Sequence, residues 1–457
     1  MTSTRPIREL GRRSRIGGMR ALLDSGPFVK LVLVLLAGLL TGLGCKGEEG
    51  RSDGPPKRII LIVVDTLRRD HVSTYAPTVP TPNIDRLAKG GQVFTNASSA
   101  FHSTTMSMAA LFTGRTPSLE TGRREAALEW NTFASCGMSR FADSESVERC
   151  VPLSLNTLAE DLREAGYYTL GVVSNKLLFN PYGFDQGFDD WIEVGRGRPG
   201  ANLTAAKAAR IRTARHVNAA VAKALARRQS DRFFLYVHYI DVHDWILFGI
   251  SYEESVRRLD AAVGQLIDLL ETKGLLEGAA IVFTSDHGEM LTDTHLHFKT
   301  LRHYGNPSFE PLLQVPLFVN PPIDMDSNEL VRSQDVRGLV RRIAGLEGGS
   351  TPDLDSDELL VTEQFYQTYR KGKWKSMWER RRDNVMLFDL ASDPRELEDL
   401  ADRHPEILAA HRMRVDELSV ELATGRTAQQ DLSPEDIERL RALGYLDGPD
   451  GDPEAQP

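Results

Sequence analysis

Cysteine is scarce in this sequence, and internal repeats are missing. Only three cysteines occur in 457 residues. Cys136 and Cys150 bracket a polar stretch, which in an oxidising compartment predicts a loop-closing disulfide worth about 3 kcal/mol. Metal binding by two lone thiols is disfavoured. No repeat recurs with a period of about 20 to 50 residues, and this excludes a solenoid.

Most of the chain carries more negative than positive charge. The formal net charge is −9, and setting aside the seven basic and two acidic residues of positions 1–44 leaves −14. Such an acidic body argues against a nucleic-acid partner. With 41% hydrophobic and 26% charged residues, the remaining sequence is that of an ordinary globular protein with one large domain and a smaller one.

The first 44 residues are typical of an export signal. A basic stretch precedes an apolar run from Leu31 to Gly44, which is too short to span a bilayer comfortably. Cys45 follows in TGLGC, which resembles a bacterial lipoprotein box, so we expect a lipid anchor on Cys45 and a periplasmic or cell-surface location. Ordinary cleavage after Gly44 is the alternative. Residues 46–56 predict a tether.

Strand patterns and helix patterns alternate after the tether, as in an α/β protein with a parallel sheet. Acidic residues or histidines stand at the ends of three apolar runs: Asp65 in 58–66, Asp241 and His243 after 231–240, and Asp286 and His287 after 279–285. Open α/β sheets place their sites at the carboxyl ends of strands. We therefore expect these side chains to lie together.

Other segments have weaker patterns. We predict helices over 82–90, 153–165 and 251–276, and strands over 93–97 and 168–174. The segment 201–228 is interpreted as a solvated helical face. WKSMWERRR, residues 374–382, is interpreted as a solvated surface, with substrate contact as the alternative.

A hydroxyl-rich stretch, HSTTMSMAALFTGR from His102 to Arg115, precedes a small-residue helix. Such a run is often only an N-cap. If the helix begins near Thr105, however, Thr104 lies at its N-terminal end, where backbone N–H groups favour an anionic oxygen. Ser103 is a fallback for the same role, as is Thr105.

Together these residues predict a metal-assisted nucleophile. Asp65, Asp286 and His287 offer two carboxylates and an imidazole to a divalent metal, without distinguishing Ca, Mg, Mn and Zn. Thr104 as a fourth ligand would be activated as the nucleophile. His243, and also His238 or His303, would hydrogen-bond the transferring anion or protonate the leaving oxygen. His238 is alternatively a satisfied core histidine.

Several segments occur in the order expected of the sulfatase family, which belongs to the alkaline-phosphatase superfamily. They include VVDTLRRDH (63–71), TTMSMAALFTGR (104–115), GYYTLGVVSN (166–175), YVHYIDVH (236–243), VFTSDHGE (282–289), FEPLLQVPLFV (309–319) and LFDLASDPRELEDLA (387–401). The resemblance covers about residues 57–447. It implies an alkaline-phosphatase-like three-layer α/β/α sandwich with a smaller C-terminal α+β subdomain, and metal-dependent hydrolysis of a sulfate or phosphate-type ester.

The resemblance also assigns residues and reveals departures. Asp65 matches the first metal ligand, and Asp286 with His287 matches the later pair. Thr104 falls where sulfatases carry the Cys or Ser that becomes formylglycine, and Met106 and Met108 replace the usual Pro and Arg. A threonine cannot yield that aldehyde, so the chain resembles the threonine-nucleophile branch, as in nucleotide pyrophosphatases and phosphoethanolamine transferases.

Further positions of the family pattern concern the substrate. His243 matches the anion-contacting histidine. Ser174 stands where the family has a lysine, and Lys176 lies two residues further on. Strict counting puts Tyr304 at the later histidine position, with His303 one residue away. From the same loop, Lys299 and Asn306 are also expected to contact the substrate.

We therefore expect an exported ester hydrolase that acts on a small-molecule or glycan substrate. The expected layout is a signal peptide (1–45), a tether (46–56), a catalytic domain (57–347), a C-terminal subdomain (348–447) and a disordered tail (448–457). One alternative is a membrane-side transferase that passes a phospho group to a lipid or glycan acceptor. The other is a degenerate, non-catalytic binding protein.

Overall fold

The computed structural model describes residues 54–118, 136–138, 141, 149–180, 182–196, 204–291, 294–296, 298–299, 307–347, 354–363, 365–380, 382 and 384–422. These residues belong to one compact unit that begins at Gly54. The predictions on the signal peptide, the lipid anchor, the boundary at 348–350, the tail, His303 and Asn306 lie outside the described residues. The division into domains therefore stays a prediction.

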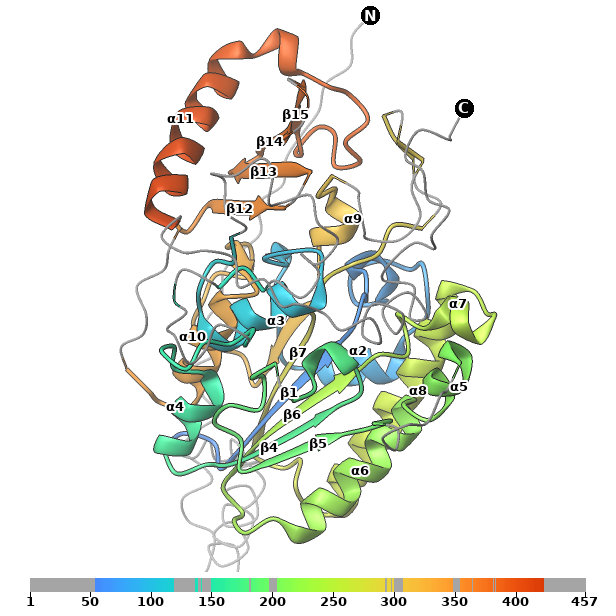
Figure 1. The fold of residues 1–457 in the computed structure, drawn as a ribbon. Coiled ribbons are helices and arrows are strands. Elements are labelled where there is room, and N and C mark those ends of the chain that lie inside the picture. Colours follow the sequence, from blue (N-terminus) through green and yellow to red (C-terminus); the bar gives the residue numbers. More distant parts are fainter. Residues whose placement is uncertain are drawn as a thin grey trace, which may run out of the picture. The chain divides into compact units, whose positions relative to one another are not determined.

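A seven-stranded sheet forms the centre of the main part (Figure 1). Its spatial order is β2 (Gln92–Val93), β10 (Leu317–Asn320), β7 (Ala279–Ser285), β1 (Arg58–Val64), β6 (Phe233–Tyr239), β4 (Tyr168–Val173) and β5 (Asp190–Glu193). β1 pairs in parallel with β6 and β7 over its full length. Near one edge β10 runs opposite to the other strands, and it pairs antiparallel with both β7 and the edge strand β2. The carboxyl ends of β1, β6 and β7 therefore meet.

The central strands are buried on both faces, as their continuous apolar runs predict. Alternate side chains of β1 enter different cores: Ile60 and Ile62 pack into one, and Ile59, Leu61 and Val63 into the other. This alternation is the two-residue period of a strand. β1 is thereby fixed in register between two layers of helices.

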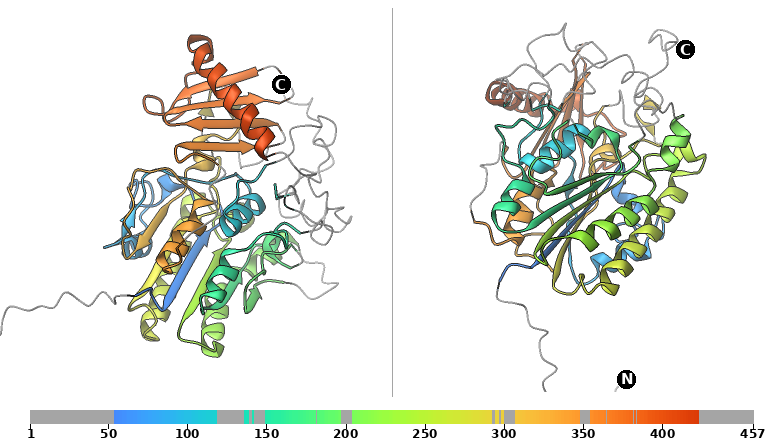
Figure 2. Two further views of the ribbon diagram at one scale, coloured as in Figure 1. Left: turned by 90° about the vertical axis from the view of Figure 1, so that its left-hand side faces the viewer. Right: turned by 60° about the horizontal axis from the view of Figure 1, so that its bottom comes forward.

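Helices cover both faces of the sheet (Figure 2). One core receives side chains from α2 (Pro82–Ala88), α6 (Ala214–Arg227) and α8 (Tyr252–Thr272). The other receives them from α3 (Thr104–Thr113), α4 (Leu158–Glu164) and α10 (Asp335–Ile343). The predicted three-layer α/β/α sandwich is confirmed.

Short elements complete the main part. The helices are α5 (Ala205–Arg210), α7 (Trp245–Phe248), α9 (Glu310–Leu313), η1 (Arg69–His71) and η5 (Lys176–Leu178); the strands are β3 (Ala97–Ser98), β8 (Thr294–His295), β9 (Phe298–Lys299) and β11 (Val331–Arg332). β3 pairs with β11, and β8 with β9.

The C-terminal part carries a four-stranded antiparallel sheet with one helix against it. Its elements are β12 (Glu358–Thr362), β13 (Tyr366–Lys371), β14 (Trp374–Glu379), β15 (Asn384–Asp389), η6 (Ala401–Arg403) and α11 (Pro405–Leu422). Val415 and Leu418 of α11 pack with Leu360 and Tyr369 of the sheet. This confirms that the C-terminal part is of the predicted α+β type.

Some predicted elements differ from the observed ones. The helix expected over 153–165 begins only at Leu158, because Thr157 and Glu160 form a capping box that fixes its start. The strand expected over 93–97 is two short strands in different sheets. The interpretation of 201–228 as a solvated face was wrong, since one face of α6 is buried in a core.

The predicted disulfide is present: Cys136 is bonded to Cys150, with their Cα atoms 5.0 Å apart. Among the residues that the structure describes, no helix is long and apolar enough to cross a membrane.

Candidate metal and nucleophile site

Buried acidic and imidazole side chains converge at the carboxyl ends of β1, β6 and β7. Asp65 follows β1, His238 lies near the end of β6, and Asp286 follows β7. One potential ligand atom from each lies within 4.8 Å of the other two, and all three side chains are fully buried. We call these three residues, together with Thr104 and His287, the strand-end cluster.

The cluster leaves polar atoms unpaired. Asp65 Oδ1, His238 Nε2 and Asp286 Oδ2 are buried and have no hydrogen-bond partner within the described part of the chain. An unsatisfied buried polar atom costs about 1–3 kcal/mol, so native structures keep few of them. Two carboxylate oxygens and one imidazole nitrogen are suitable ligands for a divalent cation. The residues present therefore fit a metal ion.

The two carboxyl groups show opposite pKa shifts. Burial alone would raise the pKa of Asp65, but the close approach of His238 and the neighbouring imidazoles of His243 and His287 lower it well below its usual value. Burial, and then the negative charge of Asp65, raise the pKa of Asp286 well above its usual range. The chain's own residues thus do not neutralise both carboxylates, and a cation would.

Hydrogen bonds orient both histidines of the cluster. His287 Nδ1 lies 2.8 Å from the carbonyl oxygen of Gly288, which can only accept, so Nδ1 carries the proton and the Nε2 lone pair faces the cluster. His238 Nδ1 lies 2.7 Å from the Tyr236 hydroxyl, while Nε2 faces Asp65 Oδ2 at 3.5 Å. The Gly288 carbonyl oxygen thereby fixes the His287 tautomer, and the Tyr236 hydroxyl holds the orientation of the His238 ring, as the outer partners of metal-binding histidines do.

Thr104 is the first residue of α3 and its side chain is almost completely buried. Its Oγ1 lies 3.4 Å from Asp65 Oδ2 and 3.5 Å from His287 Nε2. Ser103 is the N-cap but makes no side-chain capping hydrogen bond within the described structure. The hydroxyl run therefore does more than cap a helix, and Thr104 is the hydroxyl that meets the acidic residues.

Serine side chains hold α3 against the end of β7. Ser107, one turn after Thr104, donates to the carbonyl oxygen of Asp286 at 2.5 Å, and Ser99 donates to the same atom at 2.5 Å. Ser107 also lies 3.0 Å from the Ser333 hydroxyl, ahead of α10. These contacts fix Thr104 relative to Asp286.

Thr66, which directly follows Asp65, has a strained backbone conformation. Its φ is 59°, which is unusual for a β-branched residue. This turn aims the Thr66 N–H at Asp286 Oδ1, 3.1 Å away. The Tyr252 hydroxyl, 2.5 Å from the Thr66 carbonyl oxygen, secures the turn. Thr66 thus contributes its backbone N–H to the cluster.

Asn175 belongs to the site but was not predicted. Its Nδ2 donates to Asp65 Oδ2 at 2.6 Å and to Thr104 Oγ1 at 3.3 Å. The amide orientation is determined, because Asn175 Oδ1 accepts from the Leu177 N–H at 2.9 Å. Its neighbour Ser174 instead donates to the carbonyl oxygen of His238. The signal available in the sequence was a polar pair at the end of the strand before η5.

His243 is held by a buried ion pair from an unexpected segment. His243 Nδ1 lies 3.0 Å from Asp244 Oδ1, and Asp244 is bound through both oxygens by Arg212, at 2.8 and 3.0 Å. Arg212 is fully buried. It comes from the segment 201–228, to which the sequence analysis assigned no chemistry. Nδ1–H therefore faces a carboxylate, and His243 is close enough to lower the pKa of Asp65.

The remaining predicted substrate contacts are only partly placed. Lys299 lies in β9, in a hairpin with β8. His303 and Asn306 lie outside the described residues. Of the nine predicted site residues, the structure brings together Asp65, Thr104, His238, Asp286 and His287, with His243 adjacent.

Comparison with known proteins agrees with this geometry. The family model Sulfatase matches residues 57–248 and 250–335. The N-acetylgalactosamine-6-sulfatase of Canis lupus familiaris is 28% identical over 300 residues, which cover 57% of this chain and 54% of that protein. The chain spans about half the length of the three mammalian N-acetylgalactosamine-6-sulfatases that it matches in this way.

Solved structures share the fold at low identity. A 2-O GAG sulfatase superposes with a TM-score of 0.60 at 15% identity, over 86% of this chain and 96% of that one. The phosphonate monoester hydrolase of Agrobacterium radiobacter does so with a TM-score of 0.54 at 16% identity, over 80% and 96%. Fold and strand-end cluster define an alkaline-phosphatase-like α/β/α protein with a candidate metal site. The chain belongs to the sulfatase family, as its motifs predicted.

Proposed function

We propose that this protein is a metal-dependent ester hydrolase with Thr104 as its nucleophile. One observation carries the proposal: the Thr104 hydroxyl lies beside His287 and a group of two carboxylates and one imidazole, Asp65, Asp286 and His238, each with an atom that has no hydrogen bond and fits a divalent cation. Asp65, Asp286, His238 and His287 would hold the metal. When bound, it would lower the pKa of the Thr104 hydroxyl and stabilise negative charge on the substrate.

The chain's own residues account for the other steps. The Thr104 hydroxyl loses its proton to solvent, its oxygen attacks the phosphorus or sulfur of the ester, and the bond to the leaving oxygen breaks. Asn175 holds the Thr104 oxygen, and His243 gives the leaving oxygen a proton. Water then hydrolyses the Thr104 ester and restores the hydroxyl. The carboxylate of Asp244 keeps the His243 ring oriented for this transfer.

The nucleophile favours a phosphate or phosphonate ester over a sulfate ester. Threonine cannot be converted to the formylglycine aldehyde, because its extra methyl group would leave a ketone. The N-acetylgalactosamine-6-sulfatase match and the GAG sulfatase fold favour a glycan-type substrate, whereas the fold shared with a phosphonate monoester hydrolase is compatible with a phosphonate ester. We rank phosphodiesters and phosphonate monoesters first.

Purified protein supplied with Mn, Zn, Mg or Ca tests this ranking. We expect faster turnover of aryl phosphodiesters or phosphonate monoesters than of aryl sulfates. Thr104→Ala should abolish turnover while leaving the melting temperature within a few degrees, and Thr104→Ser should retain part of it. Mass spectrometry of the peptide from Ser103 to Arg115 should find a phosphorylated Thr104 in trapped enzyme. Activity on sulfates alone would reverse the ranking.

We also propose that the protein is exported and anchored through a lipid on Cys45. The support is the basic and apolar start of the sequence and the TGLGC segment. The mass of the mature N-terminal peptide tests this: a diacylated Cys45 supports the anchor, and an unmodified residue after Gly44 contradicts it.

A further inference from the structure

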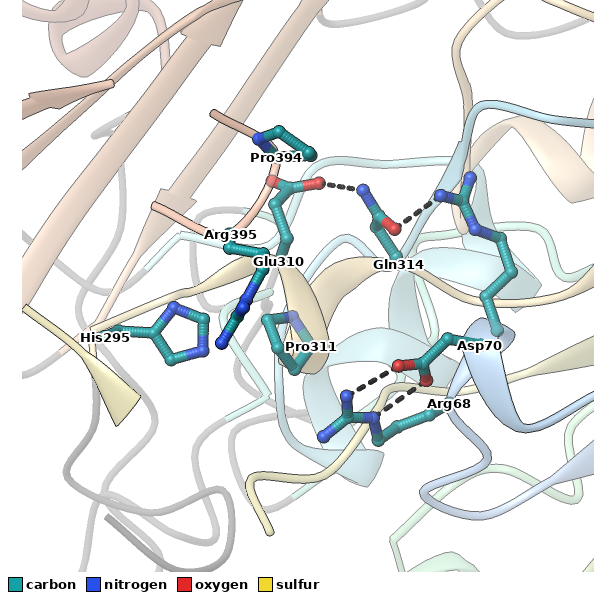
Figure 3. Close-up of a pocket in the computed structure, with 9 residues that line it drawn as sticks. Arg68, Asp70, His295, Glu310, Pro311, Gln314, Pro394 and Arg395 are labelled. Carbon is teal, nitrogen blue, oxygen red and sulfur yellow. Dashed lines mark hydrogen bonds and ion pairs between the residues drawn. The ribbon is translucent and has the colours of Figure 1, made fainter. Parts of the chain in front are cut away.

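A separate pocket lies where η1, α9 and the loop after β15 come together (Figure 3). It encloses about 630 Å³, part of which is open solvent. None of the strand-end cluster lines it. The two are nevertheless neighbours, because Arg68 at the pocket wall donates to the carbonyl oxygen of Glu289, two residues after His287.

Close packing holds the pocket and the strand-end cluster side by side. A Cβ atom at Gly288 would lie only 1.9 Å from the carbonyl oxygen of Pro311, a residue of the pocket wall. Only glycine therefore permits α9 to approach the residue after His287 so closely.

Three arginines and two acidic residues line the pocket. Both acidic residues are already paired with a cation. Asp70 accepts two hydrogen bonds from Arg68, at 2.9 and 2.7 Å. Glu310 is paired with the buried Lys375 at 2.8 Å and also accepts from Gln314 at 2.6 Å. Each carboxylate thus pairs directly with another cation, which leaves two of the three arginines of the pocket without a directly paired carboxylate among the described residues.

These two arginines are Arg69 and Arg395. Arg69 donates to the Gln314 side-chain oxygen at 2.5 Å and to the carbonyl oxygen of Thr95, both neutral acceptors. Arg395 is exposed and has no hydrogen-bond or ion-pair partner among the residues the structure describes. Gln314 bridges Glu310 and Arg69. Figure 3 shows Gln314 beside Glu310, and Arg395 entering the pocket beside His295.

A further guanidinium adds to the positive field. Arg370 of β13 donates to the Asn96 side-chain oxygen at 3.0 Å and to the carbonyl oxygen of Gly372, again without a carboxylate. Burial lowers the pKa of Arg69, the charges of Glu310 and Asp70 oppose that shift, and the charge of Arg370 adds a smaller lowering. A half-buried guanidinium without a carboxylate partner is stabilised when an anion binds.

We propose that this pocket binds an oxyanion, a sulfate, phosphate or carboxylate group, through Arg69 and Arg395. The planar guanidinium fork matches such groups in geometry as well as charge. The oxyanion comes either as a free inorganic ion or as a second anionic group of a larger substrate whose ester reacts at the strand-end cluster. Only this second source rests on the proposed function.

Binding of inorganic sulfate to metal-stripped protein tests the pocket without any turnover. Isothermal titration with sodium sulfate should detect binding to the wild type, a loss of about tenfold or more in affinity for Arg395→Gln, and partial retention for Arg395→Lys. Arg403→Gln removes an exposed arginine outside the pocket, one that pairs with Glu398, and should bind as the wild type does. Asp65→Asn should also leave binding unchanged.

The opposite pattern would overturn the proposal. It is wrong if sulfate does not bind, or if Asp65→Asn changes the affinity while Arg395→Gln leaves it unchanged, because the anion would then occupy the strand-end cluster. A kinetic measurement distinguishes a free oxyanion from an anionic group of the substrate. If the oxyanion belongs to the substrate, an aryl ester with an added carboxylate should show a higher kcat/KM than its neutral analogue, and Arg395→Gln should remove the difference. Without such a preference, calorimetric binding assigns the pocket to a free anion.

Discussion

Two buried groups of ionisable side chains in this protein differ in where their positive charge comes from. The strand-end cluster holds Asp65 and Asp286. The second group, which we call the subdomain cluster, holds Glu310 and Glu396 with Lys375, whose Nζ lies 2.8 Å from each carboxylate. Both clusters are almost completely buried. Within the described chain, no Lys or Arg pairs with either acid of the strand-end cluster.

The pKa shifts of the two clusters run in parallel. Burial opposes ionisation in both, and one carboxyl nevertheless stays ionised while its neighbour is driven towards the neutral form. Against burial, Lys375 and Arg370 bring the pKa of Glu310 down to about 2, while burial raises that of Glu396 to about 7. A buried pair of carboxyl groups thus needs a nearby positive charge. The chain provides one in the subdomain cluster, and a metal would provide it in the strand-end cluster.

The largest expected effect comes from removing a carboxylate of the strand-end cluster. Asp65→Asn should lower kcat/KM by about 10³-fold or more, because the metal and Thr104 lose a shared contact worth several kcal/mol in the transition state. Added metal should raise the melting temperature of the wild type but not that of the variant. A variant that kept its metal-dependent rise in melting temperature would contradict the assignment of Asp65 as a ligand.

In the subdomain cluster, a substitution should change the stability of the fold. Lys375→Met leaves two buried carboxyl groups without their cation, so the free energy of unfolding should fall by about 3–5 kcal/mol. Lys373→Met is the matched control, since Lys373 is half-exposed and pairs with Asp389 at the surface; it should cost about 0–1 kcal/mol. Urea unfolding measures both. Equal losses would show that Lys375 does not compensate a buried pair.

A smaller effect is expected at Asn175, which connects the strand-end cluster to the nucleophile. Asn175→Asp keeps the acceptor for the Leu177 N–H but replaces the donor to Thr104, so kcat should fall by about 10- to 100-fold. Asn218→Ala is the control, because Asn218 is also buried and hydrogen-bonded but lies in α6. It should lose stability and keep kcat. A normal kcat in Asn175→Asp would remove Asn175 from the site.

The sequence predicted those parts of the molecule that depend on local patterns. The runs that form β1, β6 and β7 are continuous and apolar, so both the strands and the acids at their ends could be placed. The contacts of Asn175, and of Arg212 with Asp244, depend on loops meeting across the sheet, and no spacing in the chain shows this. His238 was predicted at the substrate, but the geometry groups it with Asp65 and Asp286.

Segment 374–382 shows the same limit in the subdomain. Its basic and aromatic residues were interpreted as solvated surface. That interpretation was wrong for β14, where Lys375, Ser376 and Met377 are buried. Lys375 is buried because Glu310 and Glu396, 65 and 21 positions away in the sequence, surround its ammonium group. A charged residue inside the fold is predictable only when its partners are known.

The smallest expected effect is a pH dependence of stability from Glu396. Its pKa is raised from an ordinary value of 4.5 to about 7, first by burial. A raised pKa stabilises the fold at low pH; this contribution is complete below about pH 4.5 and is lost as the pH rises through about 7. Glu396→Gln keeps a neutral side chain at every pH. The difference in unfolding free energy, wild type minus variant, should therefore decrease between pH 4.5 and 7. If the unfolding free energies of the wild type and the variant ran parallel with pH, Lys375 would neutralise Glu396 as well as Glu310. The two clusters would then differ in their pKa shifts.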